Sequence, residues 1–78
     1  MYKYGQRVVC AHKDEEMAKF QPFAHPHIGA VGTVVELGTH DTYRVDWGAD
    51  GGVEYDEAMG NYSWWCLGEM LEAVDAEG

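Results

Sequence analysis

The sequence predicts a small, mostly β fold, an antiparallel barrel of five or six strands with at most one short helix. Short runs rich in β-branched and aromatic residues alternate with Gly- and Asp-rich turns between positions 32 and 74. In the clearest run, Tyr43, Val45 and Trp47 alternate with polar residues, which is the period of a strand with one buried face. Because 78 residues suffice for one modest core, the whole chain is expected to be a single domain, 1–78.

The first part of the chain predicts one strand and one long loop. The strand is expected from Gly5 to Ala11, with Val8 and Cys10 on its buried face. Residues 12–28 are predicted to be irregular, because each of the two prolines fixes its own φ and restricts the residue before it. A helical turn is predicted only at Asp14–Lys19, with Asp14 as the N-cap.

The rest of the chain predicts five more strands separated by turns. Gly and Asp residues that tolerate positive φ separate the middle strands, and a tight turn is expected at 68–70. Residues 75–78 are expected to be a frayed acidic tail. The predicted strands after the first are 31–37, 43–47, 53–56, 64–67 and 71–74.

Four groups of residues carry a resemblance to a known family. They are Gly5-x-Arg7-Val8, Gly29-x-x-Gly32-Thr33-Val34-Val35, Tyr43-x-Val45-x-Trp47, and Trp64-Trp65 followed by Leu71-Glu72. In this layout the chain resembles SH3-like barrels, in particular the Mind bomb type of SH3-like repeat and small phage-borne proteins. The resemblance implies a barrel that binds proteins or peptides. The long loop with its His and Pro residues departs from the family pattern.

Charge is unevenly distributed along the chain, whose net charge is -9. Residues 1–27 have a net charge of +1, whereas residues 28–78 hold one cation, Arg44, against eleven acids, a net of -10. Direct binding to nucleic acid or to anionic membranes is therefore not expected, because both need clustered cations. No signal peptide and no membrane-spanning run is recognisable, so a cytoplasmic protein is expected.

Two metal sites are conceivable from the residue types. A zinc site has its ligand types in Cys10, His12, His25, His27 and Cys66, but their spacing fits no standard site. For calcium, positions 1, 5, 6, 9 and 12 of an EF-hand loop would be filled by Asp46, Asp50, Gly51, Glu54 and Glu57. The third position, however, is Gly48, and the flanks are typical of strands. No metal or other cofactor is expected.

Catalytic chemistry is not expected either. Ser63 is the only serine and has no nucleophile elbow around it. Cys66 lies between apolar neighbours, which favours an inert core thiol, and the same reduced state is expected for Cys10. The pair His40-Asp41 falls in a predicted turn, where Asp favours turn geometry.

The acidic residues and one tryptophan form the candidate binding surface. Glu54 and Asp56 are expected on one side of a strand, about 6.6 Å apart, close to twice the charge spacing of about 3.4 Å along one DNA strand. Asp46 is expected on the same outer face. Because adjacent strand residues face opposite sides, Trp64 and Trp65 cannot both enter the core, and an exposed Trp is a typical interface anchor. The candidate partner-binding residues are Glu36, Asp41, Asp46, Asp50, Glu54, Asp56, Glu57 and Trp65.

These features predict a protein-binding inhibitor. Its acidic face would occupy the basic groove of a nucleic-acid-handling protein, as phage-encoded DNA mimics do, including anti-CRISPR proteins. Two alternatives stay open: a plain SH3-like adaptor module for a peptide or protein, and a metal-binding accessory protein.

Overall fold

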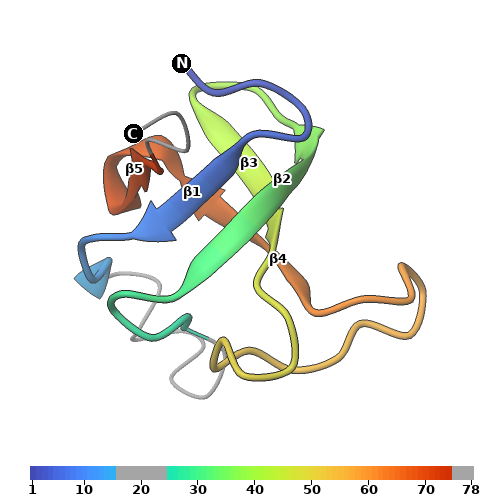
Figure 1. Ribbon diagram of the computed structural model, residues 1–78. Helices are drawn as coiled ribbons and strands as arrows, with labels where there is room; N and C mark the ends of the chain where they lie inside the picture. The colour runs from blue at the N-terminus through green and yellow to red at the C-terminus, as the bar shows by residue number, and fades with distance from the viewer. Residues whose placement is uncertain (16–24, 75–78) are drawn as a thin grey trace.

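The computed structural model, which describes residues 1–15 and 25–74, contains one antiparallel sheet of five strands (Figure 1). The order of the strands in the sheet is β4-β3-β2-β1-β5, so the first and last strands of the chain are neighbours. The prediction of a mostly β fold with five or six antiparallel strands is confirmed. The elements are β1 (Arg7–Cys10), β2 (Val31–Leu37), β3 (Thr42–Asp46), β4 (Ser63–Leu67), the 3-10 turn η1 (Gly68–Met70) and β5 (Leu71–Ala73).

The core is built from the inward-facing residues of all the strands. As the alternation predicted, Val8 and Cys10 of β1 and Tyr43 and Val45 of β3 are buried, and Trp47 just after β3 joins them. Full burial of one such aliphatic side chain contributes about 1.5–3 kcal/mol relative to leaving it exposed. The buried hydrophobic cluster consists of Val8, Cys10, Val34, Tyr43, Val45, Trp47, Val53, Cys66, Met70 and Leu71.

A β-bulge in β2 decides which of its side chains face solvent. Val34 pairs with Val45, but the next pair is Glu36 with Arg44, so one extra residue lies in β2 between them. Directly paired residues share a face of the sheet. Without the bulge, strict alternation from the buried Val34 would turn Glu36 inward; with it, Glu36 lies on the outer face and is exposed.

The prediction of a strand at 53–56 is wrong, because the structure has no strand between β3 and β4. β3 is followed by a long segment, the 47–62 loop, which extends away from the sheet in Figure 1, and the next strand is β4. β4 pairs with all five residues of β3 and takes the place expected for the missing strand. The alternation at 53–56 has another cause: Val53 is buried in the core, and Tyr55 packs edge-on against Tyr62.

Two sequence predictions fall wholly or largely outside the described residues. The helical turn at Asp14–Lys19 extends into 16–24, and the acidic tail is 75–78. The first strand is shorter than expected, since β1 begins at Arg7 and ends at Cys10. In the described part of the chain, no helix has the length and apolar character needed to cross a membrane.

Candidate partner-binding surface

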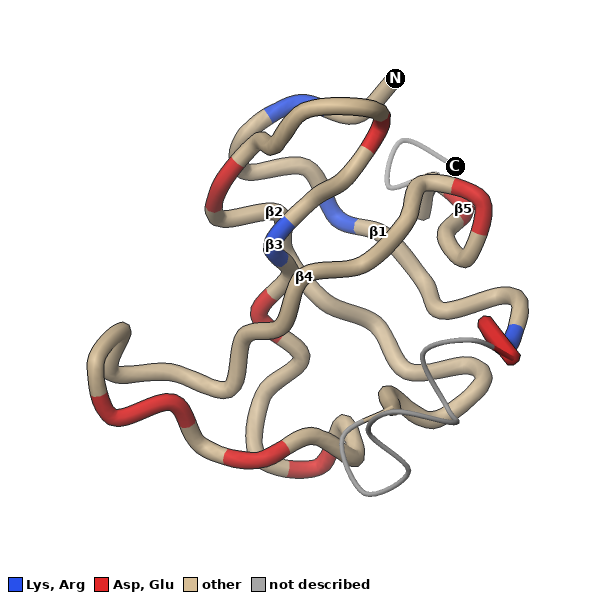
Figure 2. Tube along the Cα trace, turned by 180° about the vertical axis from the view of Figure 1, so that it is seen from behind, with Lys and Arg blue, Asp and Glu red and all other residues tan. Residues whose placement is uncertain are grey.

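The 47–62 loop carries much of the acidic charge and has no Lys or Arg of its own. In Figure 2 its acidic positions follow one another along one side of the molecule. Three of its acids, Asp50, Glu54 and Glu57, are exposed. Of the ion pairs found among the described residues, the only one that involves this loop is formed by Asp56.

The predicted acidic set does not form one continuous face. Glu36 and Asp41 lie at the β2–β3 hairpin, the opposite end of β3 from the 47–62 loop, and Figure 2 shows acidic positions at both ends. The carboxylate of Asp41 accepts a hydrogen bond from the Tyr43 hydroxyl at 2.6 Å. Its backbone carbonyl accepts one from the Gly68 N–H at 2.7 Å, so Asp41 ties the hairpin to η1.

Asp46 lies on the outer face, as predicted, because Tyr43, Val45 and Trp47 all face the core. Its carboxylate accepts a hydrogen bond from the Gly48 N–H at 3.1 Å, which shapes the start of the 47–62 loop. The prediction that Glu54 and Asp56 share one face of a strand is wrong, since neither residue lies in a strand.

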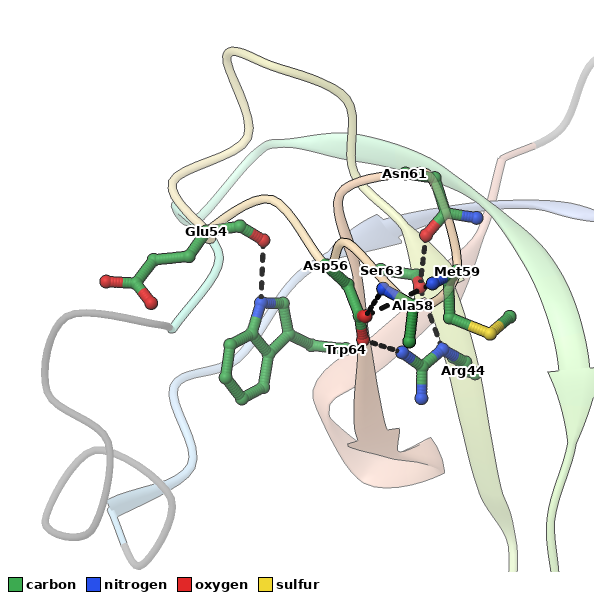
Figure 3. A network of polar contacts seen from close by, with 8 residues as sticks. All are labelled: Arg44, Glu54, Asp56, Ala58, Met59, Asn61, Ser63 and Trp64. Atoms are coloured by element: carbon green, nitrogen blue, oxygen red, sulfur yellow. Dashed lines mark hydrogen bonds and ion pairs between the residues drawn. The ribbon is translucent and has the colours of Figure 1, made fainter.

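Asp56 is the anchor of the loop (Figure 3). One carboxylate oxygen, Oδ2, forms an ion pair with Nη2 of Arg44, which lies on the outer face of β3. The other, Oδ1, accepts hydrogen bonds from the N–H groups of Ala58 at 3.0 Å and Met59 at 3.2 Å. A single carboxylate therefore stabilises the turn that follows it and joins that turn to the sheet.

The network continues from Arg44 into β4 and back to the loop (Figure 3). Arg44 Nε donates to the Ser63 hydroxyl at 2.8 Å, and that hydroxyl donates to Asn61 Oδ1 at 2.5 Å. Asn61 also pairs with Asp56, because its carbonyl accepts the Asp56 N–H at 2.7 Å. These bonds tie the second half of the loop to Arg44 on the outer face of β3 and to Ser63 at the start of β4.

Aromatic residues border this network. Trp65 is 41% exposed and Trp64 is partly buried, which confirms that one of the two lies at the surface. The Arg44 guanidinium lies 5.9 Å from the centre of the Trp65 ring, within the range of a cation–π contact. On the inner side, Trp64 Nε1 donates to the Glu54 carbonyl at 3.2 Å and so fixes the loop backbone at that point.

Five exposed residues, four of them in the 47–62 loop and one in β4, define what we call the loop surface. It combines two carboxylates with two aromatic side chains and one thioether, and one of the aromatic residues, Trp65, belongs to the sheet. Arg44 and Met59 were not among the sequence candidates, although a lone cation in an acidic region is a signal that it has a carboxylate partner. The members of the loop surface are Glu54, Tyr55, Glu57, Met59 and Trp65, all exposed.

The two cysteines are buried and free. Burial raises the pKa of the Cys66 thiol to about 12. Burial also raises the pKa of Cys10. Thiols held in the protonated form are poor nucleophiles, so both behave as core residues.

The histidines that the zinc hypothesis used contact other groups. His25 Nε2 accepts the Asp14 N–H at 3.0 Å, and His12 Nε2 lies 3.4 Å from Glu72 Oε2 at the surface. Within residues 1–15 and 25–74, no group of three or more His, Cys, Asp or Glu is placed to hold a metal ion. Comparisons of this chain with protein-family models, with curated proteins and with solved structures find no significant match.

Proposed function

We propose that this protein is a small protein-binding inhibitor whose acidic 47–62 loop docks on the basic nucleic-acid-binding site of a partner protein. The observation that carries the proposal is the set of exposed acids on this loop, which has no Lys or Arg among them. Acidic charge steers association with a basic site, and adjacent exposed aromatic residues supply anchors. The mode of action is that of phage-encoded nucleic-acid mimics such as anti-CRISPR proteins, on an SH3-like scaffold.

Among the described residues, the side-chain carboxylates of the three exposed loop acids form no hydrogen bond or ion pair, unlike those of the candidate aspartates that shape the fold. Asp41, Asp46 and Asp56 each accept hydrogen bonds that shape a turn or anchor the loop. Asp50, Glu54 and Glu57 remain as the carboxylates most available to a partner. The proposed site therefore consists of Asp50 and the loop surface.

The test compares two variants of equal charge as baits in a nuclease-treated lysate. In the first, Asp50→Asn, Glu54→Gln and Glu57→Gln remove charge from the loop and keep side-chain shape. In the second, Glu36→Gln, Glu69→Gln and Glu72→Gln remove the same charge from exposed positions elsewhere. We expect a basic partner to be retained by wild type and by the second variant, and to be lost from the first.

The retained protein must then behave as a nucleic-acid-binding protein. We expect added duplex or single-stranded DNA to displace it from the bait, and its binding to weaken as salt rises. If the loop variant retains the same protein as wild type does, or if nucleic acid never competes, the inhibitor proposal fails.

One observation favours the alternative hypothesis, that the protein is an adaptor module for a peptide or protein. Trp65 and Leu67 alternate on the outer face of β4 and are 41% and 37% exposed. An apolar peptide would use these two side chains and would bind with little dependence on salt. A partner that is lost with Trp65→Ala but retained by the loop variant would identify the protein as an adaptor.

A further inference from the structure

Arg44 is the one cation in residues 28–78, and it lies where the acidic loop meets the exposed Trp65. Its side chain is only 12% exposed, and its guanidinium contacts Asp56, Ser63 and Trp65. We infer that Arg44 is a positioning residue: it holds the acidic loop and Trp65 together as one preformed surface for a basic protein. The partner in this inference rests on the proposed function, whereas the role of Arg44 in ordering the loop does not.

The geometry requires the forked guanidinium and not simply a positive charge. Nη2 of Arg44 points to Asp56, while Nε points to the Ser63 hydroxyl at 2.8 Å. A lysine presents one compact ammonium on a flexible stem and cannot reproduce two donors with fixed separation. Arg44→Lys therefore keeps the net charge and loses the geometry.

The carboxylate of Asp56 transmits this constraint to the loop. With Oδ2 held by Arg44, Oδ1 is oriented toward the N–H groups of Ala58 and Met59. Without Arg44, the carboxylate is free to rotate and to exchange those bonds for water. The turn at 56–59 then loosens, and so does the position of the neighbouring acids relative to Trp65.

A loosened loop should weaken binding of a basic partner, whereas the change in charge alone should strengthen it. Arg44→Gln makes the surface more negative, so a purely electrostatic surface would bind a cationic partner more tightly. A preformed surface behaves differently, because a loosened loop must be ordered again on binding, and that ordering reduces affinity. The two variants at position 44 therefore separate geometry from charge.

The first measurement needs no partner. Amide hydrogen exchange is followed by NMR at Ala58 and Met59, with the Val34 amide, which donates to the Gln6 carbonyl at 2.9 Å, as internal control. We expect Arg44→Lys and Arg44→Gln to speed exchange at Ala58 and Met59 and to leave Val34 unchanged. Unchanged exchange at Ala58 and Met59 in both variants would overturn the inference.

The second measurement uses a fluorescently labelled arginine-rich peptide as the cationic probe. We expect Arg44→Lys to weaken its binding roughly fivefold at unchanged net charge, the cost of ordering one or two side chains. Arg44→Gln is expected to weaken it too. Tighter binding by Arg44→Gln together with wild-type binding by Arg44→Lys would show that charge alone decides, against the inference.

Two controls keep the outcomes distinct. If the loop variant Asp50→Asn, Glu54→Gln, Glu57→Gln binds the peptide as well as wild type, the proposed function fails while the exchange experiment still decides the role of Arg44. If either Arg44 variant unfolds because Asp56 is left partly buried and unpaired, the double variant Arg44→Gln, Asp56→Asn removes both charges. We expect faster exchange at Ala58 and Met59 in it as well, and wild-type exchange there would contradict the inference.

Discussion

Individual acidic residues have two different roles in this protein, and residue type does not distinguish them. Asp41, Asp46 and Asp56 accept hydrogen bonds from the Tyr43 hydroxyl or from nearby backbone N–H groups. Exposed acids such as Glu54 and Glu57 do not shape the fold in this way. The sequence predicted all of these residues as one binding set, because the donors that engage the first group are fixed only once the turns have formed.

Residue His40 is a point of backbone strain. Its φ is 57°, in the left-handed region, and its side chain is exposed. The left-handed conformation costs a non-glycine residue about 1–2 kcal/mol, and a glycine avoids this cost. Part of the gain is lost, because glycine also raises the conformational entropy of the unfolded chain. We expect His40→Gly to raise the free energy of unfolding by about 0.5–1 kcal/mol in urea titrations.

Asp41 is the matched control for this prediction, because its φ of 59° is nearly the same. Its carboxylate, however, accepts the Tyr43 hydroxyl at 2.6 Å. Asp41→Gly relieves the same strain but leaves that hydroxyl without its acceptor, so we expect no gain in stability. Equal stabilisation by both substitutions would show that the Tyr43 contact contributes nothing.

Cys66 makes the stability of the protein depend on alkaline pH. The pKa of its thiol is about 12 in the folded state, raised by burial from 9.0. Above pH 9.0 the thiol of the unfolded chain loses its proton, whereas the thiol of the folded chain keeps it. The free energy of unfolding therefore falls as pH rises, by up to about 1.4 kcal/mol per pH unit. Below pH 9.0 the contribution is fully present.

The test is a difference between two proteins, because tyrosines also titrate in this range. Burial is the first cause that raises the pKa of Tyr2, and the hydrogen bond to Asp41 is the first for Tyr43. Urea unfolding from pH about 8 to about 10.5 is expected to show a steeper loss of stability in wild type than in Cys66→Ala. Parallel curves would mean that the thiol is not shielded as the structure indicates.

At the scale of the elements, the contact between β2 and β3 depends on Gly32. A Cβ at this position would lie 2.6 Å from Val45 Cγ1 and 2.7 Å from the Asp46 carbonyl oxygen. The strand backbone cannot move aside as a flexible side chain would. We expect Gly32→Ala to lower the free energy of unfolding by about 1–3 kcal/mol, measured by urea denaturation.

The control for Gly32 is Gly48, where a Cβ would meet no atom within 4 Å. Its φ is 76°, so Gly48→Ala tests conformational strain without crowding. Asparagine tolerates this region better than alanine. We therefore expect Gly48→Asn to be nearly neutral and Gly32→Asn to be severely destabilising; similar effects at the two positions would exclude crowding as the cause.

Strand positions were predictable from the sequence where alternation marked a buried face, and were not where a long-range contact decided. β2 spans the residues predicted for it, and β3 differs by one residue at each end. The failure at 53–56 arose because Val53 and Tyr55 alternate like strand residues while they pack as single anchors of a loop. The segment that pairs with β3 is β4, because its Trp64 and Cys66 face the core opposite Val45 and Tyr43.

At the scale of the whole molecule, charge works against folding. A net charge of -9 on 78 residues produces self-repulsion in the compact state. The excess of acidic residues, and its place in the second part of the chain, are evident from the sequence. It did not predict that the only cation there, Arg44, forms an ion pair with Asp56, which leaves the remaining acids of the 47–62 loop without a cation of their own.

A role of the exposed loop acids in folding can be measured by removing their charge. Removing them with Asp50→Asn, Glu54→Gln and Glu57→Gln relieves repulsion, so we expect the melting temperature to rise at low salt. The gain should shrink as salt is added, because the screening length falls from about 10 Å at 0.1 M to about 3 Å at 1 M. Thermal unfolding followed by circular dichroism at several salt concentrations measures both effects.

The matched variant Glu36→Gln, Glu69→Gln, Glu72→Gln has the same net charge and should gain less. Glu36 pairs across the sheet with Arg44, so its removal also takes away an attraction. If only the loop acids destabilise the protein, they do not serve the fold, which is the result expected of residues that form an interaction surface at some cost in stability. A loop variant less stable than wild type at low salt would show instead that these acids support the fold, and the charge of the loop would then need no partner to account for it.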